Sequence, residues 1–179
     1  SRGLGDVYKR QMKSETTEKH KKLSSTDITC GVITLSDSIT TNEDDLSGQY
    51  LADETSKRYT LKSKIIIPDD REALIKTIKE MVDEDIDVIL TTGGTGLDSR
   101  DITVETVEEL FDKKIEGFGE IFRYQSFLEI GSGALISRAT AGVYKKTVIF
   151  SMPGSPNAVK TASNIICLLY TSDAADDLI

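Results

Sequence analysis

Apolar residues in this chain form short blocks that alternate with longer amphipathic stretches. Four blocks have the length and the β-branched content of buried strands, and polar residues or proline end each one. The predicted strands are 28–35 (ITCGVITL), 61–68 (LKSKIIIP), 86–92 (IDVILTT) and 146–152 (KTVIFSM). The segment 69–85 instead places apolar residues at helical spacing, which predicts an amphipathic helix.

Three further helices are predicted between and after these strands, at 47–59, 102–112 and 155–166. Ser47 is able to cap the first of them, because its hydroxyl can accept a backbone N–H. The Gly-rich segment 116–134 is assigned to no element.

Alternating strands and helices predict one α/β domain, a three-layer, doubly wound fold around a mostly parallel sheet. In such sheets, ligands bind outside the carboxyl ends of the strands. The pattern therefore gathers four loops onto one rim: 36–46, 69–70, 93–101 and 153–156.

The two ends of the chain contain a different signal. One back-translation of DVYKRQ, Asp6 to Gln11, has a reverse complement that encodes CLLYTS, Cys167 to Ser172, in the next frame. Unrelated protein ends have no reason to encode complementary DNA, and both ends resemble translated sequencing adapters. We therefore expect adapter-derived tails at 1–11 and 167–179, a disordered polar leader at 12–26, and a single domain at 27–166 whose last helix is cut near Ile166.

Composition narrows the possible partners and compartments. The expected tails contain three of the 22 basic and four of the 30 acidic residues, which leaves a net charge of −7. Nonspecific nucleic-acid binding is not expected, because each phosphate contact needs a positive group. No apolar run reaches the roughly 20 residues that cross a bilayer. We expect a soluble, cytoplasmic protein, and the lone Cys30 of the domain fits a reducing compartment.

The only histidine, His20, lies in the expected leader, so a catalytic or metal-binding histidine is not expected. The loop after the strand 86–92 is the first candidate site instead. Its glycines Gly93, Gly94 and Gly96 allow backbone N–H groups to face an anion. The spacing matches neither GxGxxG nor the Walker pattern, so the turn alone fits a plain connection as well as a ligand site.

Two aspartates on the same rim add to this candidate. Asp69 follows the strand 61–68, and Asp101 precedes the predicted helix 102–112. Each is either a turn or capping residue, or a carboxylate for Mg²⁺. Two carboxylates beside a glycine-rich anion cradle are the arrangement that metal-assisted phosphoryl or nucleotidyl transfer requires.

Other residues have two interpretations each. Gly154 and Ser155, between two prolines, form either an ordinary helix start or a second source of free N–H groups. Arg123 and Arg138 pair either with phosphate or with carboxylates. The aromatic residues of 116–134 are expected in the core or in subunit contacts; they are Phe118, Phe122, Tyr124 and Phe127.

Five motifs in this order resemble the MoaB/MogA family of molybdenum cofactor biosynthesis proteins. They are DDLSGQYLADE, IIIPDD, ILTTGGTGLDSRDIT, IEGFGEIFRYQSFLEIGSGALISRATAGV and VIFSMPGSPNAVK. The resemblance covers about Ile28 to Ile166, and the long fourth block is closer to MoaB than to MogA.

The resemblance implies molybdopterin adenylyltransfer from Mg-ATP, with ATP and molybdopterin as substrates, Mg²⁺ as the metal, and a homotrimer or hexamer as the assembly. It implies that Asp69 and Asp101 are catalytic and bind the metal. The substrate-binding residues that it implies are Gly93, Gly94, Thr95, Gly96, Arg100, Glu105, Ser137, Gly154 and Ser155.

Some MoaB-type proteins lack the carboxylate of the glycine-loop segment and do not catalyse. This chain retains Arg100 and Asp101, which favours an active enzyme. The alternatives are a catalytically silent molybdopterin-binding protein and a related domain of the CinA type.

Overall fold

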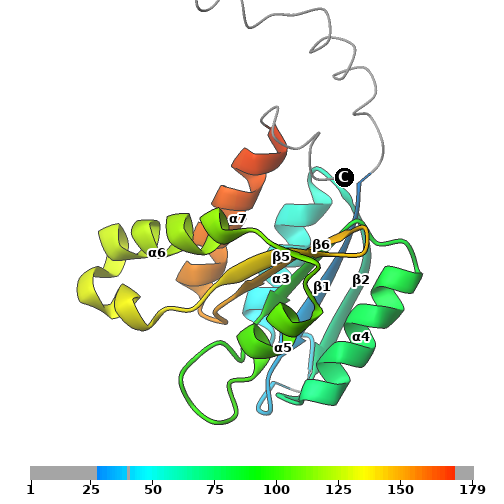
Figure 1. Ribbon diagram of the computed structural model, residues 1–179, viewed down its shortest axis with the longest axis horizontal. Helices are drawn as coiled ribbons and strands as arrows, with labels where there is room; N and C mark the ends of the chain where they lie inside the picture. The colour runs from blue at the N-terminus through cyan, green and yellow to red at the C-terminus, as the bar shows by residue number, and fades with distance from the viewer. Residues whose placement is uncertain (1–27, 40, 172–179) are drawn as a thin grey trace, which may run out of the picture.

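A six-stranded mixed sheet lies at the centre of the fold, between two layers of helices (Figure 1). The computed structural model describes residues 28–39 and 41–171, with side chains as far as Ile166. The strands are β1 (Thr29–Leu35), β2 (Thr60–Ile67), β3 (Val88–Thr92), β4 (Lys113–Lys114), β5 (Thr140–Tyr144) and β6 (Thr147–Met152), in the sheet order β2-β1-β3-β6-β5-β4.

The four strands predicted from the sequence form the parallel part of this sheet. Strand β1 pairs with β2 and β3, and β3 pairs with β6, all in parallel. Leu35 lies opposite Ile67, and Thr92 lies opposite both Thr34 and Met152, so the four strands finish at one level. The predicted mostly parallel sheet is confirmed; the antiparallel edge strands β5 and β4 were not predicted.

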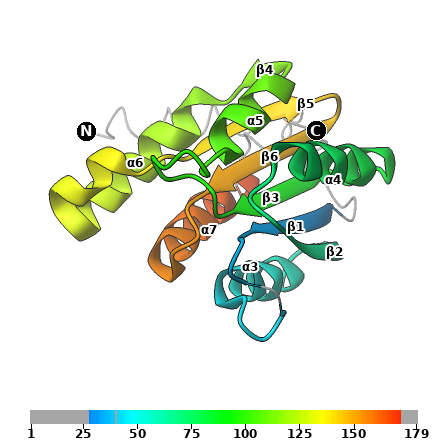
Figure 2. The same cartoon turned by 90° about the horizontal axis from the view of Figure 1, so that it is seen from below.

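Helices cover both faces of the sheet, as the doubly wound prediction requires (Figure 2). One face packs against α3 (Leu46–Ser56), α6 (Glu116–Ile130) and α7 (Pro156–Thr171), and the other against α4 (Arg71–Asp83) and α5 (Thr103–Leu110). The first core includes Leu51, Phe122, Val159 and Phe150, and the second includes Leu74, Ile78, Val107, Ile33 and Ile89. Helix α6 and the short 3₁₀ helix η1 (Gly131–Ile136) occupy the segment that the sequence left unassigned.

The predicted cap of the first helix is wrong. Helix α3 begins at Leu46, and Asp45 caps it by accepting the Gly48 N–H at 2.9 Å. Asp45 is fully buried, where it also accepts the Thr34 hydroxyl and forms an ion pair with Lys64 Nζ, each at 2.9 Å. Ser47 instead donates its hydroxyl to the Gly154 carbonyl at 2.7 Å. The residue chosen as a cap therefore joins α3 to a loop of the candidate site.

The last helix also differs from its prediction, because α7 continues past Ile166 to Thr171. The predicted leader at 12–26, the tail at 1–11 and the last residues, 172–179, lie outside the described part of the chain. No helix of the described residues is long and apolar enough to cross a membrane.

Candidate active site

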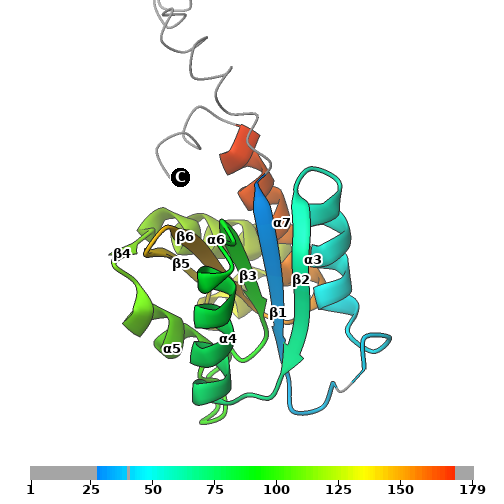
Figure 3. The ribbon, with the colours of Figure 1, turned by 90° about the vertical axis from the view of Figure 1, so that its right-hand side faces the viewer.

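The loops after β1, β2, β3 and β6 meet at the carboxyl ends of the parallel strands, at the lower end of the sheet in Figure 3. Backbone hydrogen bonds join them: Gly93 N–H donates to the Met152 carbonyl at 3.1 Å, and Ser36 N–H donates to the Ile67 carbonyl at 3.0 Å. The structure thus brings together the four loops that the sequence placed on one rim.

Both candidate carboxylates lie directly against the first glycine loop. A Cβ atom at Gly94, whose φ is +61°, would lie 2.8 Å from Asp69 Oδ1, and a Cβ atom at Gly96 would lie 2.5 Å from Asp101 Oδ2. Because these separations are too short for a real Cβ, a side chain at either glycine would displace a carboxylate or the loop. Thr103 holds this loop in place, donating its N–H to the Gly94 carbonyl and its hydroxyl to the Gly93 carbonyl, each at 2.9 Å.

Asp69 is the unusual member of the site. Its Oδ2 accepts the Asp37 N–H at 3.1 Å, whereas its Oδ1 is buried and has no hydrogen-bond partner among the described residues. Burial raises the pKa of Asp69 above its ordinary value, and repulsion from the Asp37 and Asp101 carboxylates raises it further. A buried carboxylate oxygen that lacks a partner has lost its hydration without replacement, so a cation at this position would restore the lost interaction.

Asp101 is not the side-chain cap of the following helix. Helix α5 begins at Thr103 without a side-chain capping bond, and Asp101 Oδ2 instead accepts the Asp98 N–H at 2.9 Å. The Asp101 carboxylate therefore folds back onto the glycine loop. The structure therefore rules out Asp101 as the side-chain cap of α5. Its carboxylate lies beside Gly96 instead.

Two arginines beside the glycine loop already have carboxylate partners. Arg100 Nε donates to Asp37 Oδ2 at 3.1 Å. Arg138 forms an ion pair with Glu105 and donates its Nε to the Thr95 carbonyl at 2.9 Å. The Arg138 hydrogen bond lowers the pKa of Glu105. Arg138 thus stabilises the backbone of the glycine loop, and Glu105, an implied substrate residue, is its partner.

The second glycine loop touches the first. A Cβ atom at Gly154 would lie 3.3 Å from Gly93 Cα, so the two loops form one continuous surface. Gly154 and Ser155 are exposed, and Ser155 Oγ accepts the Ala158 N–H at 3.3 Å at the start of α7. Ser137 follows η1 and directly precedes Arg138.

The residues present fit Mg²⁺ that is shared with a phosphate ligand. Within the described ranges, no group of three or more His, Cys, Asp or Glu side chains is arranged to hold a metal by itself. Mg²⁺ usually binds one or two protein carboxylates and completes its shell with substrate phosphates and water. The unpartnered Asp69 oxygen and the neighbouring Asp101 supply that number of carboxylates beside backbone that can face an anion.

One residue of this site, Asp37, had no role assigned from the sequence, and another, Arg138, had two alternatives. Asp37 contacts both Asp69 and Arg100, and Arg138 contacts Thr95. For Asp37 a signal was available, because it lies two residues beyond a predicted strand and on the same rim as Asp69. For Arg138 the sequence left phosphate and carboxylate as alternatives, and in the structure its guanidinium pairs with the carboxylate of Glu105.

An apolar cavity of about 590 Å³ lies away from this rim, between α6 and α7. Phe118, Ile121 and Ile165 are among its lining residues, and it shares no residue with the two glycine loops. Its lining suits apolar packing rather than phosphate chemistry, so the candidate site remains the rim.

A family model described as "Probable molybdopterin binding domain" matches residues 31–171. The chain belongs to the MoaB/MogA family. Within this family, "Molybdenum cofactor biosynthesis protein B" of Staphylococcus carnosus is 46% identical over 143 residues, which are 77% of this chain and 83% of the relative. "Molybdopterin adenylyltransferase" of Pyrococcus furiosus is 42% identical over 154 residues, which are 83% and 90%.

A solved structure of the family supports the same assignment. The tungsten cofactor synthesizing protein MoaB from Pyrococcus furiosus has 40% sequence identity and a TM-score of 0.78, covering 83% of this chain and 95% of its own. The resemblance seen in the motifs is thus confirmed, and this MoaB/MogA protein is a molybdenum cofactor biosynthesis protein.

Proposed function

We propose that this protein is a molybdopterin adenylyltransferase that uses ATP and Mg²⁺. The observation that carries the proposal is the buried, unpartnered Asp69 Oδ1 against Gly94, with Asp101 against Gly96. In the reaction, an oxygen of the terminal phosphate of molybdopterin forms a bond to the α-phosphorus of ATP. The bond from that phosphorus to the oxygen bridging to the β-phosphate breaks, and pyrophosphate leaves with the electron pair.

The chain's own residues position the phosphates and the metal. Backbone N–H groups of Gly94 to Gly96 and of the Gly154 loop would bind the phosphates, and Asp69 and Asp101 would hold Mg²⁺. When bound, Mg²⁺ neutralises charge on the phosphate oxygens. Both the nucleophile and the leaving group are phosphates, so positioning dominates and no protein nucleophile is needed. This fits Cys30, which is buried on β1 with its pKa raised to about 12 by burial and by Asp87.

The test is a turnover assay with molybdopterin, ATP and Mg²⁺ in which adenylyl-molybdopterin and pyrophosphate are both quantified. The proposal predicts equal amounts of the two products, and no product when Mg²⁺ is chelated. ATP hydrolysis to AMP without adenylylated pterin would contradict it. Tight molybdopterin binding without ATP consumption by folded protein would support the silent binding protein instead.

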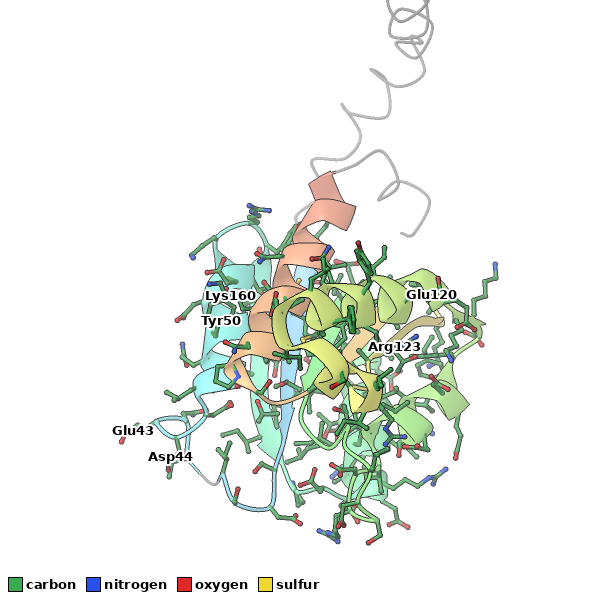
Figure 4. The ribbon with its side chains drawn as sticks, turned by 90° about the vertical axis from the view of Figure 1, so that its left-hand side faces the viewer. Glu43, Asp44, Tyr50, Glu120, Arg123 and Lys160 are labelled. Atoms are coloured by element: carbon green, nitrogen blue, oxygen red, sulfur yellow. The ribbon has the colours of Figure 1, made fainter. Side chains whose placement is uncertain are left out.

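We also propose that the protein forms a homo-oligomer, a trimer or hexamer, through the surface of α6 and η1. Figure 4 shows this face, with Glu120 and Arg123 marking α6. Seven large apolar side chains are exposed there: Ile121, Tyr124, Phe127, Leu128, Ile130, Leu135 and Ile136. A patch of this kind is typical of an interaction surface. In light scattering after size exclusion, Leu128→Glu should reduce the assembly mass, whereas Ile65→Glu, an exposed apolar site on β2, should not.

A further inference from the structure

Asp37 lies in the loop after β1, between the two charged residues that the family resemblance assigned to the site. Asp69 is 32 positions away in sequence and Arg100 is 63 positions away. The structure gives Asp37 a separate contact with each of them.

The contact with Asp69 is reciprocal. Asp37 N–H donates to Asp69 Oδ2, and Asp69 N–H donates to Asp37 Oδ1, each at 3.1 Å. Each carboxylate therefore accepts the backbone N–H of the other residue, and these two hydrogen bonds connect the loops after the neighbouring strands β1 and β2. Because Asp69 uses Oδ2 in this pair, its Oδ1 is the oxygen left for a cation at Gly94.

The contact with Arg100 uses the second oxygen of Asp37. Arg100 Nε donates to Asp37 Oδ2 at 3.1 Å, and Nη2 contacts the same atom. The guanidinium thus offsets the repulsion between the Asp37 and Asp69 carboxylates. It also ties the glycine-loop segment to the loop after β1. One residue therefore contacts both partners: its backbone N–H holds the carboxylate of a candidate metal ligand, and its carboxylate holds the Asp69 backbone and a candidate phosphate-binding cation.

We propose that Asp37 is a positioning residue for the adenylyl-transfer site, holding Asp69 Oδ1 toward the metal position and Arg100 beside the glycine loop. This inference rests on the proposed function. Asp37 itself acts through Asp69 and Arg100. Partners of metal ligands typically change metal affinity about 10- to 100-fold when they are removed.

Two substitutions separate the contacts. Asp37→Asn keeps a carbonyl oxygen that can accept the Asp69 N–H, but its amide group cannot accept from Arg100. Asp37→Ala removes the acceptors of both the Asp69 N–H and Arg100, and it keeps only the backbone N–H that donates to Asp69 Oδ2. Asp44→Asn is the matched control, because Asp44 is an exposed carboxylate of the same loop that accepts the Thr41 hydroxyl (Figure 4). Arg100→Gln removes the other side of the ion pair.

The readouts are the concentration of Mg²⁺ that gives half-maximal turnover, kcat, KM for molybdopterin, and the affinity for Mn²⁺ in the presence of ATP. We expect Asp37→Ala to weaken Mg²⁺ activation and Mn²⁺ affinity about tenfold, with its Tm close to that of wild type. Asp37→Asn should keep most of the metal affinity but lower kcat as much as Arg100→Gln does, and the double substitution should cost no more than either single one. Asp44→Asn should behave as wild type.

Several outcomes would overturn the inference. Unchanged metal dependence in Asp37→Ala would do so, as would a loss that follows the fraction of unfolded protein, or fully additive losses for Asp37→Asn and Arg100→Gln. If the wild-type protein makes no adenylyl-molybdopterin, the proposed function fails. The positioning role is then decided by Mn²⁺ affinity alone, and wild-type protein that binds no Mn²⁺ with ATP overturns both.

Discussion

The two ends of the parallel sheet each present a half-buried aspartate, and only one of these carboxylates is satisfied. At the amino ends of the strands, Asp87 Oδ2 accepts both the N–H and the hydroxyl of Thr29 at 2.8 Å. At the carboxyl ends, Asp69 Oδ1 is buried with no partner among the described residues. Aspartate therefore has a structural role at the amino ends of the strands, whereas at the carboxyl ends one of its oxygens has no hydrogen-bond partner among the described residues.

The surroundings of the two aspartates differ in the same way. Asp87 lines a surface pocket together with Lys145 and Lys146, and Lys145 Nζ lies 3.5 Å from Asp83 Oδ1. Near Asp69, the neighbouring charges are the carboxylates of Asp37 and Asp101 together with Arg100. A cluster of acidic residues is thus insufficient to define a site. The distinguishing features are the unpartnered oxygen and the glycine backbone that approaches it.

The largest expected effect is on catalysis at the carboxyl end. Asp101→Asn keeps an oxygen for the Asp98 N–H but removes the charge, so kcat should fall about 100- to 1,000-fold while KM for molybdopterin changes little. Asp87→Asn makes the same chemical change at the other end and should leave kcat within about twofold of wild type. Equal effects of the two substitutions would remove the distinction between the ends.

The next effect comes from the glycine loop. Gly94→Ala should lower kcat about 10- to 100-fold, because the new Cβ would lie 2.8 Å from Asp69 Oδ1 and 2.5 Å from Thr103 Oγ1 and would shift the carboxylate. Gly117→Ala in α6 is the control, since a Cβ there has no atom within 4 Å. Gly94→Ala with wild-type kinetics would show that the close approach of Gly94 to Asp69 has no catalytic importance.

The smallest expected effects are on stability, and they have opposite signs. The pKa of Asp69 is raised in the folded protein, so folding favours the protonated carboxyl group. The ionised carboxylate therefore lowers the free energy of unfolding at neutral pH. This destabilisation disappears as pH falls through the folded-state pKa. Asp69→Asn should therefore raise Tm by about 2–4 °C, while lowering activity. Asp87→Ala should lower Tm by about 3–6 °C, because two hydrogen bonds are lost.

Thermal unfolding followed by circular dichroism checks both values, with activity measured on the same samples. A lower Tm for Asp69→Asn would mean that its carboxylate stabilises the ligand-free fold. Asp69 and Asp87 would then differ in their place in the sheet, and not in whether hydrogen bonds satisfy their carboxylates.

The sequence predicted the parts of the fold that local pattern determines. The four parallel strands and α4 have unbroken apolar periodicity, and the rule that ligands bind at carboxyl ends placed Asp69 and Asp101 on one rim. Helix α6 was missed because Gly117 and Gly119 weaken the helical signal. Gly119 is nevertheless needed there, since a Cβ atom would lie 2.7 Å from the Ala139 carbonyl oxygen, a contact made only in the folded chain.

The missed side-chain roles depend on contacts between distant residues. Both Asp45 and Ser47 are suitable capping residues, and the buried ion pair with Lys64 of β2 that accompanies the Asp45 cap is not visible locally. Asp37, Asp69 and Arg100 belong to three different loops, so no spacing rule connects them. Local sequence could therefore propose the carboxylates but could not show which of their oxygens lacks a partner.

We propose that Asp69, at the carboxyl ends of the strands, holds a divalent cation together with substrate phosphate. The most direct test of this proposal is electron paramagnetic resonance of Mn²⁺ titrated into the protein with ATP, for wild type, Asp69→Asn and Asp87→Asn. We predict saturable binding to wild type, affinity weakened at least about tenfold by Asp69→Asn, and no change for Asp87→Asn. Equal Mn²⁺ affinity of Asp69→Asn and wild type would contradict the account.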